Sequence, residues 1–78
     1  MNTASFTIFV VEDDEWYRKL LVYTLELNPD YRVVAFENGE SLMKALKEKP
    51  QVITLDYRLP DTNGEELLKK IKEIAPEI

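Results

Sequence analysis

The chain has 78 residues and a formal net charge of −5, and it contains neither cysteine nor histidine. Disulfides, thiolate zinc sites, cysteine nucleophiles and histidine ligands are therefore excluded. The 45% of apolar and 32% of charged residues are typical of one small globular domain, and the acidic balance argues against contact with nucleic acid. No apolar run approaches ~20 residues, and residues 1–5 do not resemble a signal peptide. We expect a cytoplasmic protein with no membrane segment.

The first half of the chain has the pattern of strand, helix and strand. Residues 6–11 are almost continuously apolar and β-branched or aromatic, which is typical of a strand buried in a parallel sheet. From Trp16 to Leu27 the apolar residues recur every three or four positions and predict an amphipathic helix. Residues 28–30 (Asn-Pro-Asp) end that helix, and residues 31–36 predict the second strand.

The second half repeats this alternation. A helix is expected after the turn at Asn38 and Gly39, and it ends before Pro50. Residues 51–56 predict a third buried strand, and 57–64 predict a loop. The last helix is expected over 65–74, with four inward apolar residues: Leu67, Leu68, Ile71 and Ile74. The order βαβαβα predicts an α/β fold with a parallel sheet and right-handed crossovers.

Carboxylates follow two of the predicted strands. Glu12 and Asp13 come directly after the first strand, and Asp56 ends the third. The carboxyl ends of parallel strands meet at one edge, so these groups converge if the two strands are neighbours. Two like charges ~4 Å apart repel by about 4 kcal/mol at an effective dielectric near 20. Mg²⁺, which prefers oxygen ligands, would offset that repulsion, and a carboxylate beside it can attack phosphorus.

Simpler interpretations exist for each acidic residue. Asp13 or Asp14 also fits as the N-cap of the following helix, where the helix dipole favours negative charge. Asp56 also fits as a turn-forming residue at the end of a strand.

Two motifs resemble the receiver domain of response regulators in two-component signalling. One is Val-Val-Glu-Asp-Asp at 10–14, and the other covers 52–64, where Asp56 is followed by Leu-Pro at 59–60 and Asn-Gly at 63–64. The resemblance extends from Phe6 onward. It implies a flavodoxin-like fold with strand order 2-1-3 for the three predicted strands, and a non-enzymatic domain.

The resemblance also implies a role for each site residue. Asp56 matches the phosphoacceptor, which takes a phosphoryl group from a sensor histidine kinase or a small phosphodonor. Asp13 matches a direct Mg²⁺ ligand, Glu12 a ligand acting through water, and the backbone carbonyl of Arg58 the remaining protein ligand. Asp56 itself completes the implied set.

Residues 1–78 match the N-terminal half of the family domain, and the chain ends where the fourth strand begins. The family's Ser/Thr after strand four, its Lys after strand five and its aromatic switch residue have no counterpart here. We therefore expect strand 51–56 to be an exposed edge and the sheet face beside the first helix to be partly bare. Such surfaces predict a homo-oligomer. The alternative function is a self-associating assembly fragment whose acidic site is idle.

Overall fold

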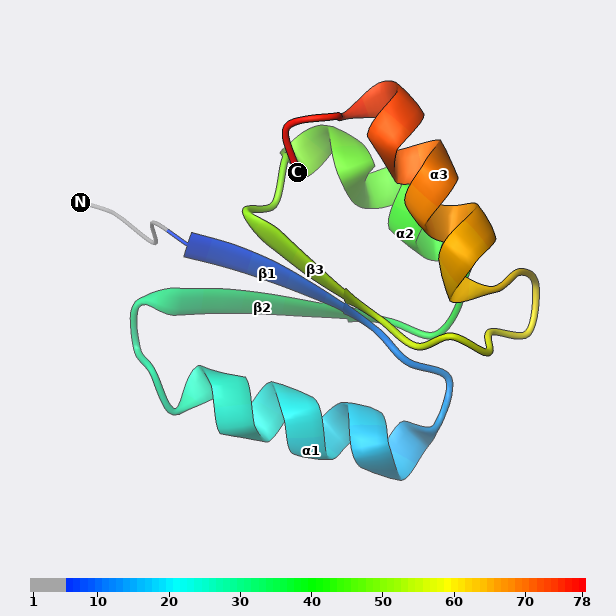
Figure 1. The fold of residues 1–78 in the computed structure, drawn as a ribbon. Helices are drawn as coiled ribbons and strands as arrows, with labels where there is room; N and C mark the ends of the chain where they lie inside the picture. The colour runs from blue at the N-terminus through cyan, green and yellow to red at the C-terminus, as the bar shows by residue number, and fades with distance from the viewer. Residues whose placement is uncertain (1–5) are drawn as a thin grey trace.

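A parallel sheet of three strands forms the centre of the computed structural model, which describes residues 6–78 (Figure 1). The strands are β1 (Phe6–Val11), β2 (Tyr31–Phe36) and β3 (Val52–Leu55), in the order β2-β1-β3. The helices are α1 (Glu15–Glu26), α2 (Gly39–Ala45) and α3 (Gly64–Ile74), and a 3₁₀ turn (Leu46–Glu48) follows α2. The predicted α/β fold class and strand order are confirmed. The expectation about residues 1–5 lies outside the described residues.

Helices cover the two faces of the sheet unequally. Figure 1 shows α2 and α3 on one face and α1 alone on the other. The core lies between the sheet and the α2–α3 layer, where eight buried apolar residues form one cluster: Phe9, Val11, Leu42, Leu46, Leu59, Leu67, Ile71 and Ala75. Because β1 is the central strand, its side chains are buried on both faces, as its continuous apolar pattern predicts.

Helix α1 is less buried than its wide apolar stripe suggests. It packs against β2 and β1, yet none of its residues is fully buried, and the side chains of Trp16 and Tyr23 are 73% and 67% exposed. A single helix covers only part of a sheet face, so the flanks of its stripe stay in solvent. Within residues 6–78, no helix is long and apolar enough to cross a membrane.

Helix α3 departs from the prediction in one respect. Leu67 and Ile71 are buried, whereas Leu68 and Ile74 are 47% and 66% exposed, so the expectation that all four point inward is wrong. Only a narrow face of α3 contacts the sheet and α2. Strand β3 is also shorter than expected, and its exposure alternates, because Ile53 and Leu55 face the core while Val52 and Thr54 face away from it.

Candidate functional site

The carboxyl ends of β1 and β3 place Glu12 and Asp56 side by side. Val11 and Leu55, the last residues of these strands, are paired in the parallel register. The backbone N–H of Asp56 donates to the Val11 carbonyl at 3.0 Å, and that of Glu12 donates to the Phe36 carbonyl at 3.0 Å. The backbone at both acidic residues is thus held by sheet hydrogen bonds.

Three predicted site residues come together at this edge and form what we call the acidic cluster: Glu12, Asp13 and Asp56. One carboxylate oxygen from each lies within 4.8 Å of the others. Glu12 is buried, with 7% of its surface exposed, while Asp56 is half-buried and Asp13 is exposed. The predicted convergence of the three side chains is therefore present.

The environment of Glu12 disfavours its charged form. Burial raises the pKa of this carboxyl above its ordinary value of 4.5, and the neighbouring Asp56 and Asp13 raise it further. The Asp14 backbone N–H donates to Glu12 Oε2 at 3.2 Å and opposes the shift in pKa, without cancelling it. A cation bound at the cluster would relieve this penalty.

No basic side chain pairs with the cluster among the residues that the structure describes. The ion pairs there join Lys19 to Glu15, Arg32 to Glu48 and Lys44 to Glu40. Arg18 lies near, but its guanidinium donates to the backbone carbonyl of Glu12, at 2.9 Å. A set of carboxylate oxygens with no thiolate or imidazole fits a hard divalent cation such as Mg²⁺.

The competing role of helix N-cap falls to Asp14. Its Oδ1 accepts from the backbone N–H of Tyr17 at 2.8 Å, at the start of α1. One of the two capping alternatives is thereby confirmed. Asp13 remains in the acidic cluster.

Arg58 lies in the loop that follows β3, two residues beyond Asp56. Its side chain is exposed, and its backbone forms an isolated antiparallel bridge with Asn63. The role of its carbonyl as a ligand stays a prediction.

Sequence reasoning missed the aromatic border of the site. An open hollow of about 280 Å³ beside the cluster is lined by Tyr17 of α1 and Tyr57 of the loop, together with the ends of β1 and β3. Tyrosines 40 positions apart carry no shared pattern, so only the fold reveals that they line one hollow.

The sequence model of the response regulator receiver domain matches residues 8–78. This chain belongs to that family. The interpretation of the chain as a receiver domain is therefore favoured over that of a self-associating assembly fragment.

Relatives with curated names carry the same segment within longer proteins. The chain is 38% identical over 74 residues to the transcriptional regulatory protein CssR of Bacillus subtilis, covering 95% of this chain and 32% of that protein. It is 39% identical to a protein-glutamate methylesterase/protein-glutamine glutaminase of Thermotoga maritima (97% and 23%) and 36% identical to the response regulator receiver protein CpdR of Brucella abortus (91% and 59%). The chain thus spans less than two thirds of each relative.

Solved receiver domains share the fold. The BeF3-activated DrrB receiver domain superposes with a TM-score of 0.82 at 36% identity, over 92% of this chain and 59% of that one. The response regulator domain of Thermotoga maritima CheB gives a TM-score of 0.81 at 40% identity, over 91% and 55%. The matched segment in each case is the receiver domain, and receiver domains in general are not enzymes.

Proposed function

We propose that this chain is a phosphoacceptor module of a two-component phosphorelay in the cytoplasm, and that Asp56 takes the phosphoryl group. The observation that carries the proposal is the convergence of three carboxylates within 4.8 Å at the carboxyl edge of the sheet. The phosphoryl group comes from a sensor histidine kinase or a small phosphodonor, since receiver domains in general interact with these. Family membership supports the proposal.

The carboxylate oxygens of the acidic cluster are suitable ligands for Mg²⁺. The ion would be held by Glu12, Asp13, Asp56 and the Arg58 carbonyl. Bound there, Mg²⁺ would supply positive charge opposite the phosphoryl oxygens. The backbone hydrogen bond from Asp56 to Val11 fixes the position of the nucleophile on the sheet edge. The adjoining hollow leaves Asp56 open to an approaching donor.

The proposed chemistry is one displacement at phosphorus. A carboxylate oxygen of Asp56 forms the new P–O bond. The bond that breaks is P–N in a phosphohistidine donor, or the P–O bond to the acyl group in acetyl phosphate. Its electron pair leaves with the imidazole, which takes a proton from solvent, or with the acetate. The product is an aspartyl phosphate.

Incubation with acetyl phosphate and Mg²⁺ tests this function. We expect an intact-mass gain of one phosphoryl group in the wild type and none in Asp56→Asn, because the amide is not a nucleophile toward phosphorus. The Asp30→Asn variant makes the same chemical change in the α1–β2 turn and is expected to keep the gain. Equal labelling of Asp56→Asn, or no labelling of the wild type, would refute the proposal.

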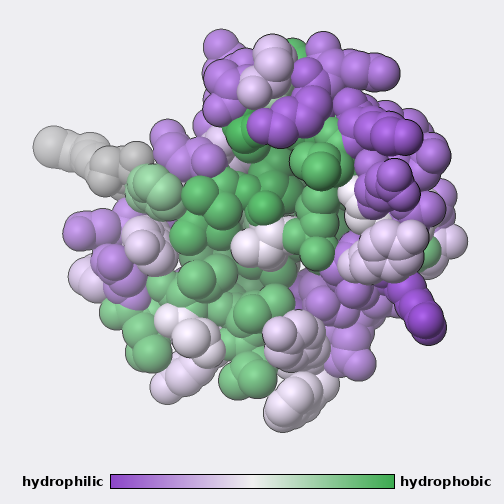
Figure 2. All heavy atoms as spheres, in the orientation of Figure 1, coloured by the Kyte–Doolittle hydropathy of each residue, from purple (hydrophilic) through white to green (hydrophobic). Residues whose placement is uncertain are grey.

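A second copy of the chain is the other partner that we propose. Within residues 6–78, β3 has a strand neighbour on one side only, and Val52 is 39% exposed there. A neighbouring hollow of about 310 Å³ is lined mainly by apolar residues of β3 and α3, including the exposed Leu68, with Gln51 and Lys72 also lining it. Figure 2 shows hydrophobic residues gathered across the middle of this view, between α3 and α1. Such an edge favours pairing with another strand.

A further inference from the structure

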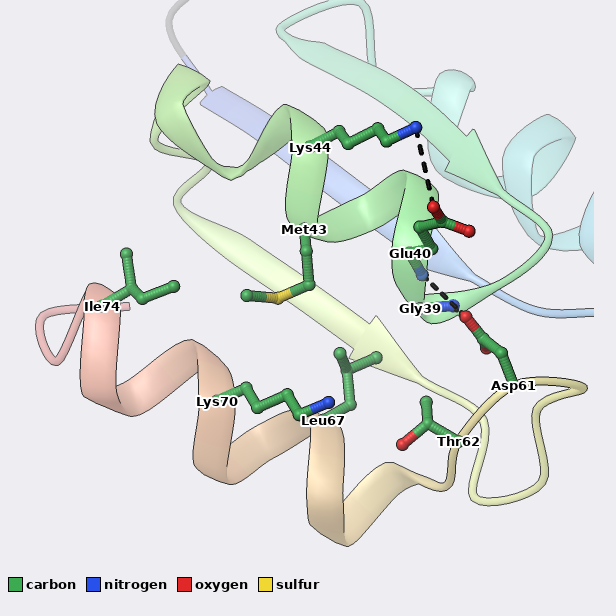
Figure 3. A pocket seen from close by; sticks show the side chains of 9 residues that line it. All are labelled: Gly39, Glu40, Met43, Lys44, Asp61, Thr62, Leu67, Lys70 and Ile74. Carbon is green, nitrogen blue, oxygen red and sulfur yellow. Dashed lines mark hydrogen bonds and ion pairs between the residues drawn. The ribbon is translucent and has the colours of Figure 1, made fainter.

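Asp61 joins the loop after β3 to the start of α2. Its Oδ1 accepts from the backbone N–H of Gly39 at 2.9 Å, and its Oδ2 accepts from that of Glu40 at 2.9 Å. Figure 3 shows the Asp61 carboxylate pointing at the first turn of α2. The contact spans 22 residues of sequence, so it connects two parts of the fold that are distant along the chain.

The loop after β3 approaches the start of α2 so closely that a side chain at Gly39 would meet the side chain of Thr62. A Cβ added at Gly39 would lie 2.8 Å from Thr62 Cγ2, a distance that real Cβ atoms do not show. The absence of a side chain at Gly39 therefore lets the loop rest directly on the α2 terminus, where the Asp61 carboxylate reaches both N–H groups.

The rest of the loop is also held, by contacts on either side of Asp61. Leu59 is buried in the core, and its N–H donates to the Thr62 carbonyl at 3.2 Å. Asn63 caps α3 by accepting from the Glu66 N–H at 2.9 Å. These contacts fix the loop to the core and to α3, and Asp61 alone links it through a side chain to α2 in the described hydrogen-bond set.

A groove of about 470 Å³ lies beside the Asp61 contact. It runs between α2 and α3, and Asp61 and Thr62 line it together with residues of both helices (Figure 3). Leu67 of α3 packs with Leu42 of α2 in the core cluster, but the groove beside them is open, so the Asp61 hydrogen bonds hold the loop at its rim. Without these hydrogen bonds, the loop keeps its core contact through Leu59 but loses its side-chain link to the start of α2.

We propose that Asp61 is a positioning residue for the acidic cluster, because it anchors the loop that begins with Asp56 and carries the Arg58 carbonyl. This inference rests on the proposed function. The N–H groups of Gly39 and Glu40 also lower the pKa of Asp61 below its ordinary 3.8, which keeps it charged as an acceptor. Without this anchor the loop around Arg58 is held less tightly, and Mg²⁺ affinity falls on the order of 10-fold, as for other residues that orient ligands.

Calorimetric titration of the whole chain with Mg²⁺ alone, paired with urea unfolding, tests the role. We expect Asp61→Ala to raise the Mg²⁺ dissociation constant on the order of 10-fold, and Asp61→Asn, whose single amide oxygen keeps one acceptor, to raise it less. Asp30→Ala is the matched control, since it removes the same charge in the α1–β2 turn, and it should bind as the wild type does. Gly39→Ala, which displaces Thr62 without changing charge, should weaken binding in the same direction.

The outcomes separate this inference from the proposed function. Mg²⁺ affinity of Asp61→Ala equal to that of Asp30→Ala, with only the unfolding free energy lowered, would mean that Asp61 is structural and would overturn the inference alone. If Asp61→Ala does not fold, the comparison of Asp61→Asn with Asp30→Asn decides in the same way. A wild type that binds no Mg²⁺ would overturn both the inference and the metal site.

Discussion

Glu12 is the buried member of the acidic cluster, and its ionisation is unfavourable in the metal-free protein. Burial and the nearby Asp56 and Asp13 carboxylates raise its pKa above 4.5. A residue chosen for packing alone would not be a carboxylate at this position. The charge of Glu12 therefore opposes folding of the metal-free protein at neutral pH, and a cation bound at the cluster would offset this cost.

Replacing Glu12 by Gln should stabilise the metal-free protein at neutral pH, because the buried negative charge is gone. Since the folded-state pKa of Glu12 is raised, wild type and variant should be equally stable below pH 4.5, and the wild type should lose stability relative to the variant as the pH rises through the raised pKa. Urea unfolding with a chelator, over a pH series, measures this difference.

Glu26→Gln is the control for Glu12→Gln, since Glu26 is exposed on α1. Saturating Mg²⁺ should make the wild type more stable than Glu12→Gln, because the ion binds the folded wild type more tightly than this variant. A variant that is less stable than the wild type without metal at neutral pH would show that the Glu12 charge is not a net cost.

Adjacent residues of helix α3 differ sharply in burial. Leu67 and Leu68 are adjacent, and helical spacing predicts an inward position for both, yet they are 1% and 47% exposed. Leu67 lies in the core cluster with Leu42 of α2, while Leu68 lines the open hollow beside β3. The width of the buried face depends on what packs against the helix.

Leu67→Ala should lower the free energy of unfolding by about 2–5 kcal/mol, because it opens a cavity in the core. Leu68→Ala, the same change one residue later, should alter it by no more than roughly 0.5 kcal/mol. Thermal or urea unfolding of the two variants measures both values. Similar losses at the two positions would mean that the outer face of α3 is covered in solution.

The elements themselves were predictable from the sequence, and their burial was predictable only in part. The apolar run of 6–11 determined β1, and the alternation of strands and helices determined the parallel order. The convergence of Glu12 with Asp56 was predictable, because the carboxyl ends of parallel strands meet at one edge of the sheet. The contact of Asp61 with Gly39 could not be predicted, because it joins the loop after β3 to the start of α2 through backbone N–H groups that every residue but proline carries, and no side-chain pattern marks it.

At the scale of the whole molecule, apolar surface remains open along β3 and beside α1. Val52 on the strand, Leu20 on α1 and Leu68 on α3 are each at least 39% exposed. A domain of this size hides only about 60% of its unfolded surface, so further burial through association brings a proportionally large gain. The edge of β3 also offers backbone donors and acceptors to another strand.

Sedimentation equilibrium of the 78-residue chain at micromolar concentration should show dimers or larger species, and Val52→Lys should shift them toward monomer, because an edge lysine opposes strand pairing. Ile74→Lys is the control, since it places the same charge on an exposed residue that lines the groove between α2 and α3 and does not line the hollow beside β3. Association that survives Val52→Lys would place the contact on the sheet face beside α1, and a compact monomeric wild type would contradict self-association.

The central place of β1 also has a consequence for synthesis on the ribosome. Its residues pair with 31–36 on one side and with 52–55 on the other. Strand β1 is synthesised before both of its partners and must wait for β3 before both of its edges are paired, and such distant pairings slow folding. Until Leu55 has left the exit tunnel, the nascent chain exposes its most apolar strand, which is the stage at which a chaperone would have the most to bind.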